Sequence, residues 1–311
     1  MENQALGLAE AVQRLFPSAI TVKRIHWRSA FDKLPSALKA DWMLDPCSDA
    51  VTPAPGEGWP DLWIATGRAT LPLSAAVRAR SGGRTFVVQT QDPRWRTDAY
   101  DLIVPPRHDR VSGDNVLSII GSPHRVNQDR LSEGGKAFAE RLEPLPRPRV
   151  AALIGGRSMA FDLTEAHAAE LADMIATSVE AAGGSLMLTC SRRTPDAARN
   201  VLTRRLSHLP GLIWGGEGAN PYFAFLDAAD HILVTEDSAN MAAEAASTGK
   251  PVYILPMIPL KGPGKFARLH DQLRDWGAAR PFDGRLEDWT YPRLNETERA
   301  AHEVLKRLAA R

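Results

Sequence analysis

The side chains best suited to chemistry lie in the stretch 231–256, which reads as strand, acidic turn, short helix and strand. Glu236, Asp237 and Ser238 follow the first apolar segment, and these residue types favour the start of a helix. Gly249 supplies a helix end before the second apolar segment. The pattern predicts a βαβ unit whose acidic turn lies at the carboxyl end of a strand, where open α/β sheets bind ligands.

The predicted helix carries a polar face that contains no lysine or arginine. Asp237, Asn240, Glu244 and Thr248 fall near helical spacing, so they are expected to share one side. Carboxylates and amides without cations suit hydroxyl-rich ligands such as a ribose diol or a sugar. The alternative is a carboxylate cluster favoured by the helix macrodipole, with Glu244 solvated, and the local pattern does not decide between the two.

Other loops of the second half also follow strand-like runs and carry groups that could bind phosphate. Two glycines open the loop 155–158, where backbone N–H groups could cradle oxygens, although a Gly-Gly turn is the simpler reading. Arg192 and Arg193 precede a predicted helix start at Thr194-Pro195, which suits a diphosphate, with a salt-bridged arginine pair as the alternative. The expected nucleotide- and phosphate-binding residues are Gly155, Gly156, Arg157, Ser158, Ser191, Arg192, Arg193, Thr194, Asn220, Glu236, Asp237, Ser238, Asn240 and Glu244. Because the acidic turn would repel phosphate, we expect the glycine and arginine loops to bind the phosphates and Glu244 the ribose.

Composition indicates an ordinary globular protein of about two domains, with 311 residues, 44% hydrophobic and 24% charged. A formal net charge of +1 does not suggest a general nucleic-acid or membrane-surface binder. Cys47 and Cys190 are the only cysteines, which excludes a disulfide framework and a cysteine-rich zinc site. With no apolar run of transmembrane length and no signal peptide, we expect a cytoplasmic protein, at most peripheral to a membrane. No metal and no tightly bound cofactor are expected.

The elements that would position these loops alternate between strand and helix through both halves. Prolines at 144, 146 and 148 read as a stiff linker between an N-terminal domain, 1–145, and a C-terminal nucleotide-binding domain, 146–290. A C-terminal helix in 291–311 is expected to pack back toward the first domain. Strands are also predicted at 20–27 and 115–120, and a short helix at 30–39. This alternation of strands and helices predicts an α/β protein with two domains facing each other across a cleft.

Several candidate acid/base groups follow strand-like runs of the first half. Asp92 and His124 are the two that we expect to be catalytic, with His108, Asp109 and Arg125 in similar positions. Each histidine taken alone is more often structural. No Gly-x-Ser-x-Gly elbow surrounds Ser238, and the eight histidines are scattered, so neither a hydrolase triad nor a zinc site is indicated.

The motifs in order resemble the ELM1-like family, which is named after a plant mitochondrial-fission protein. The resemblance covers nearly the whole chain, and its motifs are specific only in combination. They are Asn3-Gln4-Ala5-Leu6-Gly7, Gln91-Asp92-Pro93-Arg94, Val104-Pro105-Pro106 with His108-Asp109, Pro123-His124-Arg125, Ile154-Gly155-Gly156-Arg157-Ser158, Cys190 to Pro195, Asn220-Pro221-Tyr222 and Thr235 to Pro251.

This resemblance implies a GT-B-like architecture of two Rossmann-like domains, the first on the acceptor side. The stretch 238–251 is also similar to the donor-site element of MurG-type glycosyltransferases, which would give Glu244 the ribose diol and Ser238 a phosphate or nearby hydroxyl. Family members usually carry a strand and an Asp-Gly-Arg-Ala-Gly-like loop ahead of the Asn3 segment. We therefore expect the N-terminal domain to lack its first strand, leaving acceptor binding and the general base unassigned.

Three functions fit these observations. The first is a glycosyltransferase that binds a nucleotide-diphosphate sugar in the cleft and transfers the sugar to an unidentified acceptor, with a lipid-linked or cell-envelope glycan as the candidate. Binding of nucleic acid is not expected. The second function is a non-catalytic adaptor in membrane or organelle fission, as the resemblance suggests. The third is a sugar-nucleotide epimerase, for which no acid/base pair is visible.

Overall fold

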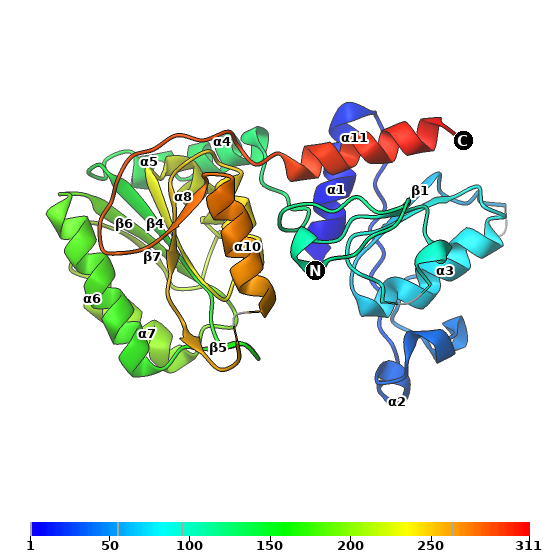
Figure 1. Ribbon diagram of the computed structural model, residues 1–311, viewed down its shortest axis with the longest axis horizontal. Coiled ribbons are helices and arrows are strands. Elements are labelled where there is room, and N and C mark those ends of the chain that lie inside the picture. The colour runs from blue at the N-terminus through cyan, green and yellow to red at the C-terminus, as the bar shows by residue number, and fades with distance from the viewer. Residues whose placement is uncertain (1, 55, 95, 263) are drawn as a thin grey trace. The chain divides into compact units, whose positions relative to one another are not determined.

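The computed structural model describes residues 2–54, 56–94, 96–262 and 264–311. Contacts divide the chain into two units, with Met1–Arg125 and Asn295–Arg311 in unit 1 and Val126–Leu294 in unit 2 (Figure 1). Each unit contains a parallel β-sheet together with helices, which confirms the predicted α/β class.

Unit 2 is organised around a six-stranded sheet in which every pairing is parallel. Its strands lie in the order β11 (Ala279–Pro281), β9 (Val252–Leu255), β8 (His231–Thr235), β4 (Arg149–Ile154), β6 (Ser185–Cys190) and β7 (Gly211–Trp214). The chain runs outward from β4 through β6 and β7, then returns to the other side of β4 with β8. This reversal between β4 and β8 is a topological switch point, the place where doubly wound sheets bind ligands.

Helices surround this sheet, because its two central strands, β4 and β8, are buried along their whole length. All six residues of β4 are buried, as expected for a parallel strand covered on both faces. The elements α6 (Glu165–Ala181) and α7 (Asp196–Leu206) bury an apolar stripe against β4 and β6, and Figure 1 shows them on the opposite side of the strands from α10 (Gly264–Asp275). Contacts also join α8 (Tyr222–Ala228) to β4 and α9 (Ala239–Ala246) to β8 and β9. The remaining elements are α4 (Gln128–Ala137), α5 (Ala139–Leu142) and an antiparallel pair of β5 (Phe161–Asp162) with β10 (Ile258–Pro259).

Unit 1 contains a smaller parallel sheet of β1 (Leu62–Ala65), β2 (Phe86–Gln89) and β3 (Leu102–Ile103). One apolar cluster joins the strands to α1 (Glu2–Leu15) and α11 (Glu296–Ala309), which contact each other along their lengths. A second cluster joins them to α3 (Leu71–Arg80) and to part of the segment 25–51. That segment contains α2 (Ser29–Asp32) and 3₁₀ turns at Ser36–Leu38 and Asp41–Met43, and further 3₁₀ turns lie at Arg68–Thr70, Thr97–Ala99 and Arg107–Asp109.

Three sequence predictions of local structure in unit 1 are wrong. The segment 20–27 is not a strand, because its backbone bonds to side chains and turns of 45–49, for example from Arg24 N to Asp49 Oδ2 at 2.5 Å. The segment 115–120 makes only isolated bridges, from Val116 to Ile103 and from Ile119 to Pro106. The helix predicted at 30–39 is α2 followed by a separate 3₁₀ turn, since Pro35 interrupts the hydrogen-bonding pattern.

The contacts place the unit boundaries elsewhere than at residues 145 and 290. Helix α4 belongs to unit 2 because Gly134 lets it lie directly against α8, where an added Cβ would meet Ala224 N at 2.8 Å. Helix α11 belongs to unit 1 through its packing on α1. Leu8 of α1 is fully buried.

Candidate functional site

The loops that follow β4 and β8 meet at the switch point of unit 2 and are bonded to each other. Gly155 N donates to Thr235 Oγ1 at 2.6 Å, and Gly156 N donates to Asp237 Oδ2 at 2.9 Å. Thr235 Oγ1 in turn donates to Asp237 Oδ1 at 2.7 Å. The carboxyl ends of the two central strands are therefore tied together by one buried threonine and one buried aspartate.

Asp237 also binds the arginine loop that follows β6. Arg193 Nη1 lies 2.8 Å from Asp237 Oδ2, and the carboxylate itself has no exposed surface. A buried carboxylate needs such charge-assisted partners, because without them its desolvation would be very costly. The charge of Asp237, one of the two carboxylates that we expected to repel phosphate at this turn, is thus paired with an arginine inside the protein.

The two glycines are required by close packing rather than by a turn. A Cβ on Gly155 would lie 2.0 Å from Asp237 Oδ1, and one on Gly156 would lie 2.1 Å from the backbone oxygen of Arg193. No side chain fits at either position unless the surrounding loops move apart. The Gly-Gly pair thus allows three strand-end loops to interlock.

The expected phosphate cradle at 155–158 is not open in this structure. All four N–H groups donate within unit 2, since Arg157 N bonds to Arg193 O at 3.1 Å and Ser158 N to Phe161 O at 2.9 Å. Ser158 Oγ accepts from the backbone N–H groups of Ala160 and Phe161, each at 3.1 Å. A phosphate would have to displace these bonds. In this structure the loop 155–158 therefore serves to hold the neighbouring loops together.

The arginine loop divides into structural and accessible parts. Thr194 is buried and donates to Gly155 O, while Ser191 Oγ accepts from Arg193 N at 3.2 Å. Arg192 is exposed, and no hydrogen bond or ion pair joins its side chain to any residue that the structure describes. Arg192 is therefore the guanidinium of this loop that is available to a ligand.

The polar face predicted on the following helix is only partly formed. Helix α9 covers Ala239–Ala246, so Asn240 and Glu244 share its side, whereas Asp237 precedes the helix and Thr248 follows it. Thr248 is buried and donates to Ala245 O at 2.7 Å. The expectation of four residues on one face was wrong because the helix is shorter than their spacing requires.

The N-terminus of α9 has no side-chain cap. Ser238 occupies the N-cap position without a side-chain cap bond, and the first intrahelical bond runs from Ala242 N to Ser238 O at 3.1 Å. The preceding N–H groups of the first turn have no partner within the helix, and the helix dipole adds positive potential there. This end of the helix, beside Ser238, is where an anionic oxygen would be stabilised.

Glu244, one turn further along α9, is held by a tyrosine that sequence reasoning did not select. Tyr222 Oη, at the start of α8, donates to Glu244 Oε2. Burial raises the pKa of Glu244 to about 7, while the hydrogen bond from Tyr222 acts in the opposite direction. The signal in the sequence was the position of Tyr222 after Asn220-Pro221, but nothing local indicates which carboxylate it meets.

The remaining unit 2 candidates make local contacts. Asn220 Oδ1 accepts from Tyr222 N at 3.0 Å, and Asn240 is exposed. Glu236 Oε2 accepts from Met257 N at 3.3 Å, and burial raises the pKa of Glu236. Arg157 is exposed, with its Nε 3.5 Å from Asp162 Oδ1.

The two catalytic candidates of unit 1 have different surroundings. Asp92 follows β2, and its Oδ1 accepts from Arg94 N at 2.8 Å, which leaves the side chain partly exposed. His124 is buried, and its backbone N donates to Thr297 Oγ1 at 3.2 Å. The packing of Gly7 directly against the His124 backbone further fixes this segment.

Neither a metal site nor a membrane-spanning helix is found within the described ranges. No group of three or more histidine, cysteine, aspartate or glutamate side chains there could hold a metal ion. No helix in those ranges has the length and hydrophobicity that crossing a bilayer requires.

The fold of unit 2 is that of a doubly wound α/β protein with polar residues at its switch point. The family model described as "Mitochondrial fission ELM1" matches residues 1–308, and the chain belongs to this family. The mitochondrial fission protein ELM1 of Arabidopsis thaliana is 31% identical over 287 residues, which are 81% of this chain and 65% of that protein. The uncharacterized protein RP120 of Rickettsia prowazekii is 26% identical over 284 residues, 79% of each chain.

Solved structures of low sequence identity are also similar. The UDP-GlcNAc 2-epimerase of Neisseria meningitidis, bound to UDP-GlcNAc, has a TM-score of 0.45 at 13% identity, covering 81% of this chain and 77% of that one. MurG of Acinetobacter baumannii has a TM-score of 0.44 at 12% identity, covering 79% and 74%.

Proposed function

We propose that this chain binds a nucleotide-diphosphate sugar at the switch point of unit 2 and transfers the sugar to an acceptor hydroxyl. The observation that carries the proposal is the arrangement around α9, where an uncapped helix N-terminus lies one helical turn from a carboxylate. The first group suits a phosphate oxygen and the second suits a ribose diol. Both follow β8 at the strand-order reversal.

The bound molecule would be held by groups with distinct tasks. Ser238 and the first turn of α9 take one phosphate, and Arg192 neutralises the remaining negative charge of the diphosphate. Glu244 accepts hydrogen bonds from the ribose hydroxyls, in the orientation that Tyr222 imposes. The interlocked loops 155–158 and 191–194 act as the rigid base beneath these groups.

This assignment supports transfer without a metal ion. Attack of an acceptor hydroxyl on the anomeric carbon releases the nucleoside diphosphate, whose charge Arg192 and the helix N-terminus stabilise. A base must take the hydroxyl proton, and Asp92 and His124 stay the predicted candidates for that role.

Calorimetric titration of the full chain with UDP, GDP and ADP tests the proposal. We expect saturable binding of one of them, weakened about tenfold or more in Glu244→Ala, since a hydrogen-bonded charged group contributes on the order of 1.5–3 kcal/mol. Arg192→Gln should weaken the diphosphate but leave the affinity for the matching nucleoside unchanged. Glu165→Ala, an exposed carboxylate in the first turn of α6, is the matched control.

The internal bonding of 155–158 gives weight to a second function, a non-catalytic adaptor of the kind that the family description suggests. The four N–H groups of that loop would then stay in their present bonds at all times. Absence of saturable binding for all three nucleotides would contradict the transferase and leave the adaptor as the function of this fold.

A further inference from the structure

A cavity of about 230 Å³ lies at the carboxyl edge of the unit 1 sheet and is lined by charged residues. It is bounded by Pro35, Ser36, Arg68, Leu71, Asp92, Pro93 and Arg94. Arg68 comes from the turn after β1, and Asp92 and Arg94 come from the turn after β2. Carboxyl ends of neighbouring parallel strands meet at one edge of a sheet, so these side chains converge although they are distant in sequence.

Arg68 is the charged residue of this cavity whose charge is not paired with a carboxylate. Its side chain is exposed and has no hydrogen bond or ion pair with any described residue. Ser36 adds a hydroxyl to the same lining. A guanidinium without a partner, lining a cavity beside a hydroxyl group, is suited to bidentate binding of an oxyanion.

Arg94 is directed to the cavity by a strained backbone. Its φ is +53°, a left-handed conformation that a non-glycine residue rarely adopts, and the bond from its N–H to Asp92 Oδ1 at 2.8 Å holds the turn. Arg94 Nε lies 3.7 Å from Asp92 Oδ2, too far for a close hydrogen bond. The lining therefore offers two cations and one carboxylate, and it keeps a net positive charge.

We propose that this cavity binds a phosphate monoester that carries a neighbouring hydroxyl group. Arg68 and Arg94 would bind the phosphate, while the carboxylate of Asp92 accepts a hydrogen bond from the hydroxyl group. Leu71, the first residue of α3, places the positive end of that helix at the same cavity. The motif Gln91-Asp92-Pro93-Arg94 is thus assigned to ligand binding.

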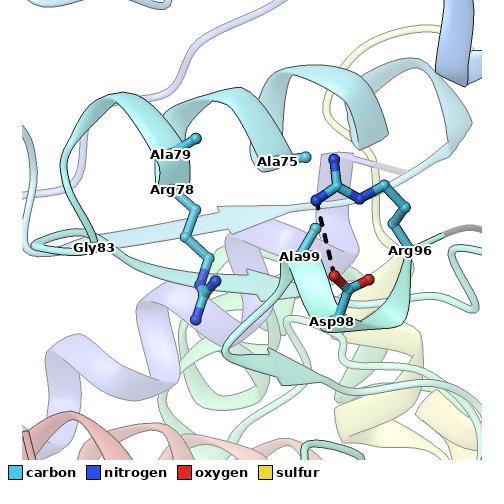
Figure 2. Close-up of a pocket in the computed structure, with 7 residues that line it drawn as sticks. All are labelled: Ala75, Arg78, Ala79, Gly83, Arg96, Asp98 and Ala99. Atoms are coloured by element: carbon cyan, nitrogen blue, oxygen red, sulfur yellow. Dashed lines mark ion pairs between the residues drawn. The ribbon is translucent and has the colours of Figure 1, made fainter.

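A second cavity in unit 1 also contains two arginines and provides a comparison (Figure 2). There Arg78 Nε is bonded to Asp101 Oδ1 at 2.9 Å, while Arg96 Nη2 lies 3.8 Å from Asp98 Oδ2, a separation similar to that of Arg94 from Asp92. Its helical lining comes from the C-terminal half of α3, where the dipole is negative. Because Arg78 is already bonded to a carboxylate, whereas Arg68 is not, and because the end of α3 at this cavity repels anions, we assign the phosphate to the first cavity.

The inference deepens the proposed function, on which its biological meaning rests: the acceptor of the sugar would be a phosphate-bearing alcohol. Binding itself is independent of the nucleotide site, because every lining residue belongs to unit 1. The two proposals can therefore fail separately.

The test titrates the full chain with glycerol 3-phosphate, inorganic phosphate and glycerol, followed by calorimetry and by backbone amide NMR shifts. We expect saturable binding of glycerol 3-phosphate, weaker binding of inorganic phosphate and none of glycerol, with shifts concentrated at 67–71 and 92–94. Arg68→Gln and Arg94→Gln should each weaken glycerol 3-phosphate by about tenfold or more, as expected for a charge-assisted hydrogen bond. Asp92→Asn should reduce the preference over inorganic phosphate, and Arg96→Gln in the comparison cavity should change nothing.

Two results would overturn the assignment. One is the absence of saturable binding, and the other is binding that Arg68→Gln leaves intact, with shifts at 191–193 or 238–241 instead. Loss of nucleotide binding in the unit 2 experiment, with Arg68-dependent phosphate binding retained, would reject the transferase while keeping this site. Circular dichroism of each variant establishes that the exposed arginine substitutions leave the fold intact.

Discussion

Glu244 is a carboxylate whose charge depends on its surroundings at ordinary pH. Burial disfavours its ionised form and raises its pKa to about 7, and the phenol of Tyr222 partly reverses this by donating a hydrogen bond to the carboxylate. Burial and the neighbouring Glu244 carboxylate also push the pKa of Tyr222 well above its ordinary value, so the phenol keeps its proton. Tyr222 is therefore a constant hydrogen-bond donor, and it orients the Glu244 carboxylate, which titrates at ordinary pH.

Nucleotide-sugar affinity is predicted to fall as the pH drops through about 7. The ionised carboxylate accepts both ribose hydroxyls, whereas the protonated form must use one oxygen as a donor. Above that pKa the affinity should be constant, and below it the affinity should fall by up to about tenfold per pH unit. Calorimetric titrations at a series of pH values between about 5.5 and 8.5 measure how the affinity depends on pH.

Two variants separate this origin from a general effect of pH. Glu244→Gln should remove the dependence on pH, because the amide does not titrate. Tyr222→Phe removes the bond that lowers the pKa of Glu244, so the midpoint should move to higher pH. An unchanged profile in Glu244→Gln would show that another group controls binding.

At the scale of elements, three loops from β4, β6 and β8 form one interlocked layer. Each contributes groups that the others cannot replace: the Gly155 and Gly156 amides, the Arg193 carbonyl and guanidinium, and the Asp237 carboxylate. The layer fixes the start of α9, since Ser238 follows Asp237 directly. Rigid strand ends of this kind are what hold a ligand site in place.

Gly156→Ala is predicted to destabilise the protein by about 1–3 kcal/mol, the usual cost of overpacking. The new methyl group would lie 2.1 Å from Arg193 O, which is backbone and cannot turn away. Gly215→Ala, in the open loop after β7, has no neighbour within 4 Å and is the matched control. Chemical denaturation of both variants checks the difference, and equal midpoints would contradict the packing explanation.

At the scale of the whole molecule, the two units differ in how the chain builds their cores. The main apolar cluster of unit 2 is made entirely from residues of the continuous segment 126–294. The cluster between α1 and the unit 1 sheet also needs Ala300, Ala301 and Val304 from α11, which are fully buried. The core of unit 1 is therefore complete only when α11 packs against it.

A fragment of residues 126–294 is predicted to fold and to unfold cooperatively, whereas a fragment of residues 1–125 should not. Without α11 the second fragment loses several buried apolar side chains, each contributing roughly 1–3 kcal/mol, against a total stability of about 5–15 kcal/mol. Thermal melts followed by circular dichroism measure both fragments. Adding a peptide of residues 295–311 should restore the transition of the first-half fragment, and a cooperative melt without it would contradict the prediction.

The sequence by itself determined the α/β class, most strands of unit 2 and the positions of its loops after those strands. Apolar runs such as Val150–Ile154, and helix signals such as Gly249, act over a few residues, so their meaning does not depend on distant parts of the chain. The sequence also selected Glu244 and Ser238 through the order of motifs. It failed at 20–27, where alternating residues bond to a loop instead of a sheet.

Only the tertiary structure decided which polar groups remain available to a ligand. Gly156 and Asp237 are 81 positions apart, and Tyr222 and Glu244 are 22 apart, so no local pattern reveals that they bond. The strand order brings β8 beside β4 and thereby places Asp237 under the glycine loop. Hydrogen-bonding capacity is set by residue type, but its use is set by topology, and here topology commits the Gly155 and Gly156 amides to bonds within the protein.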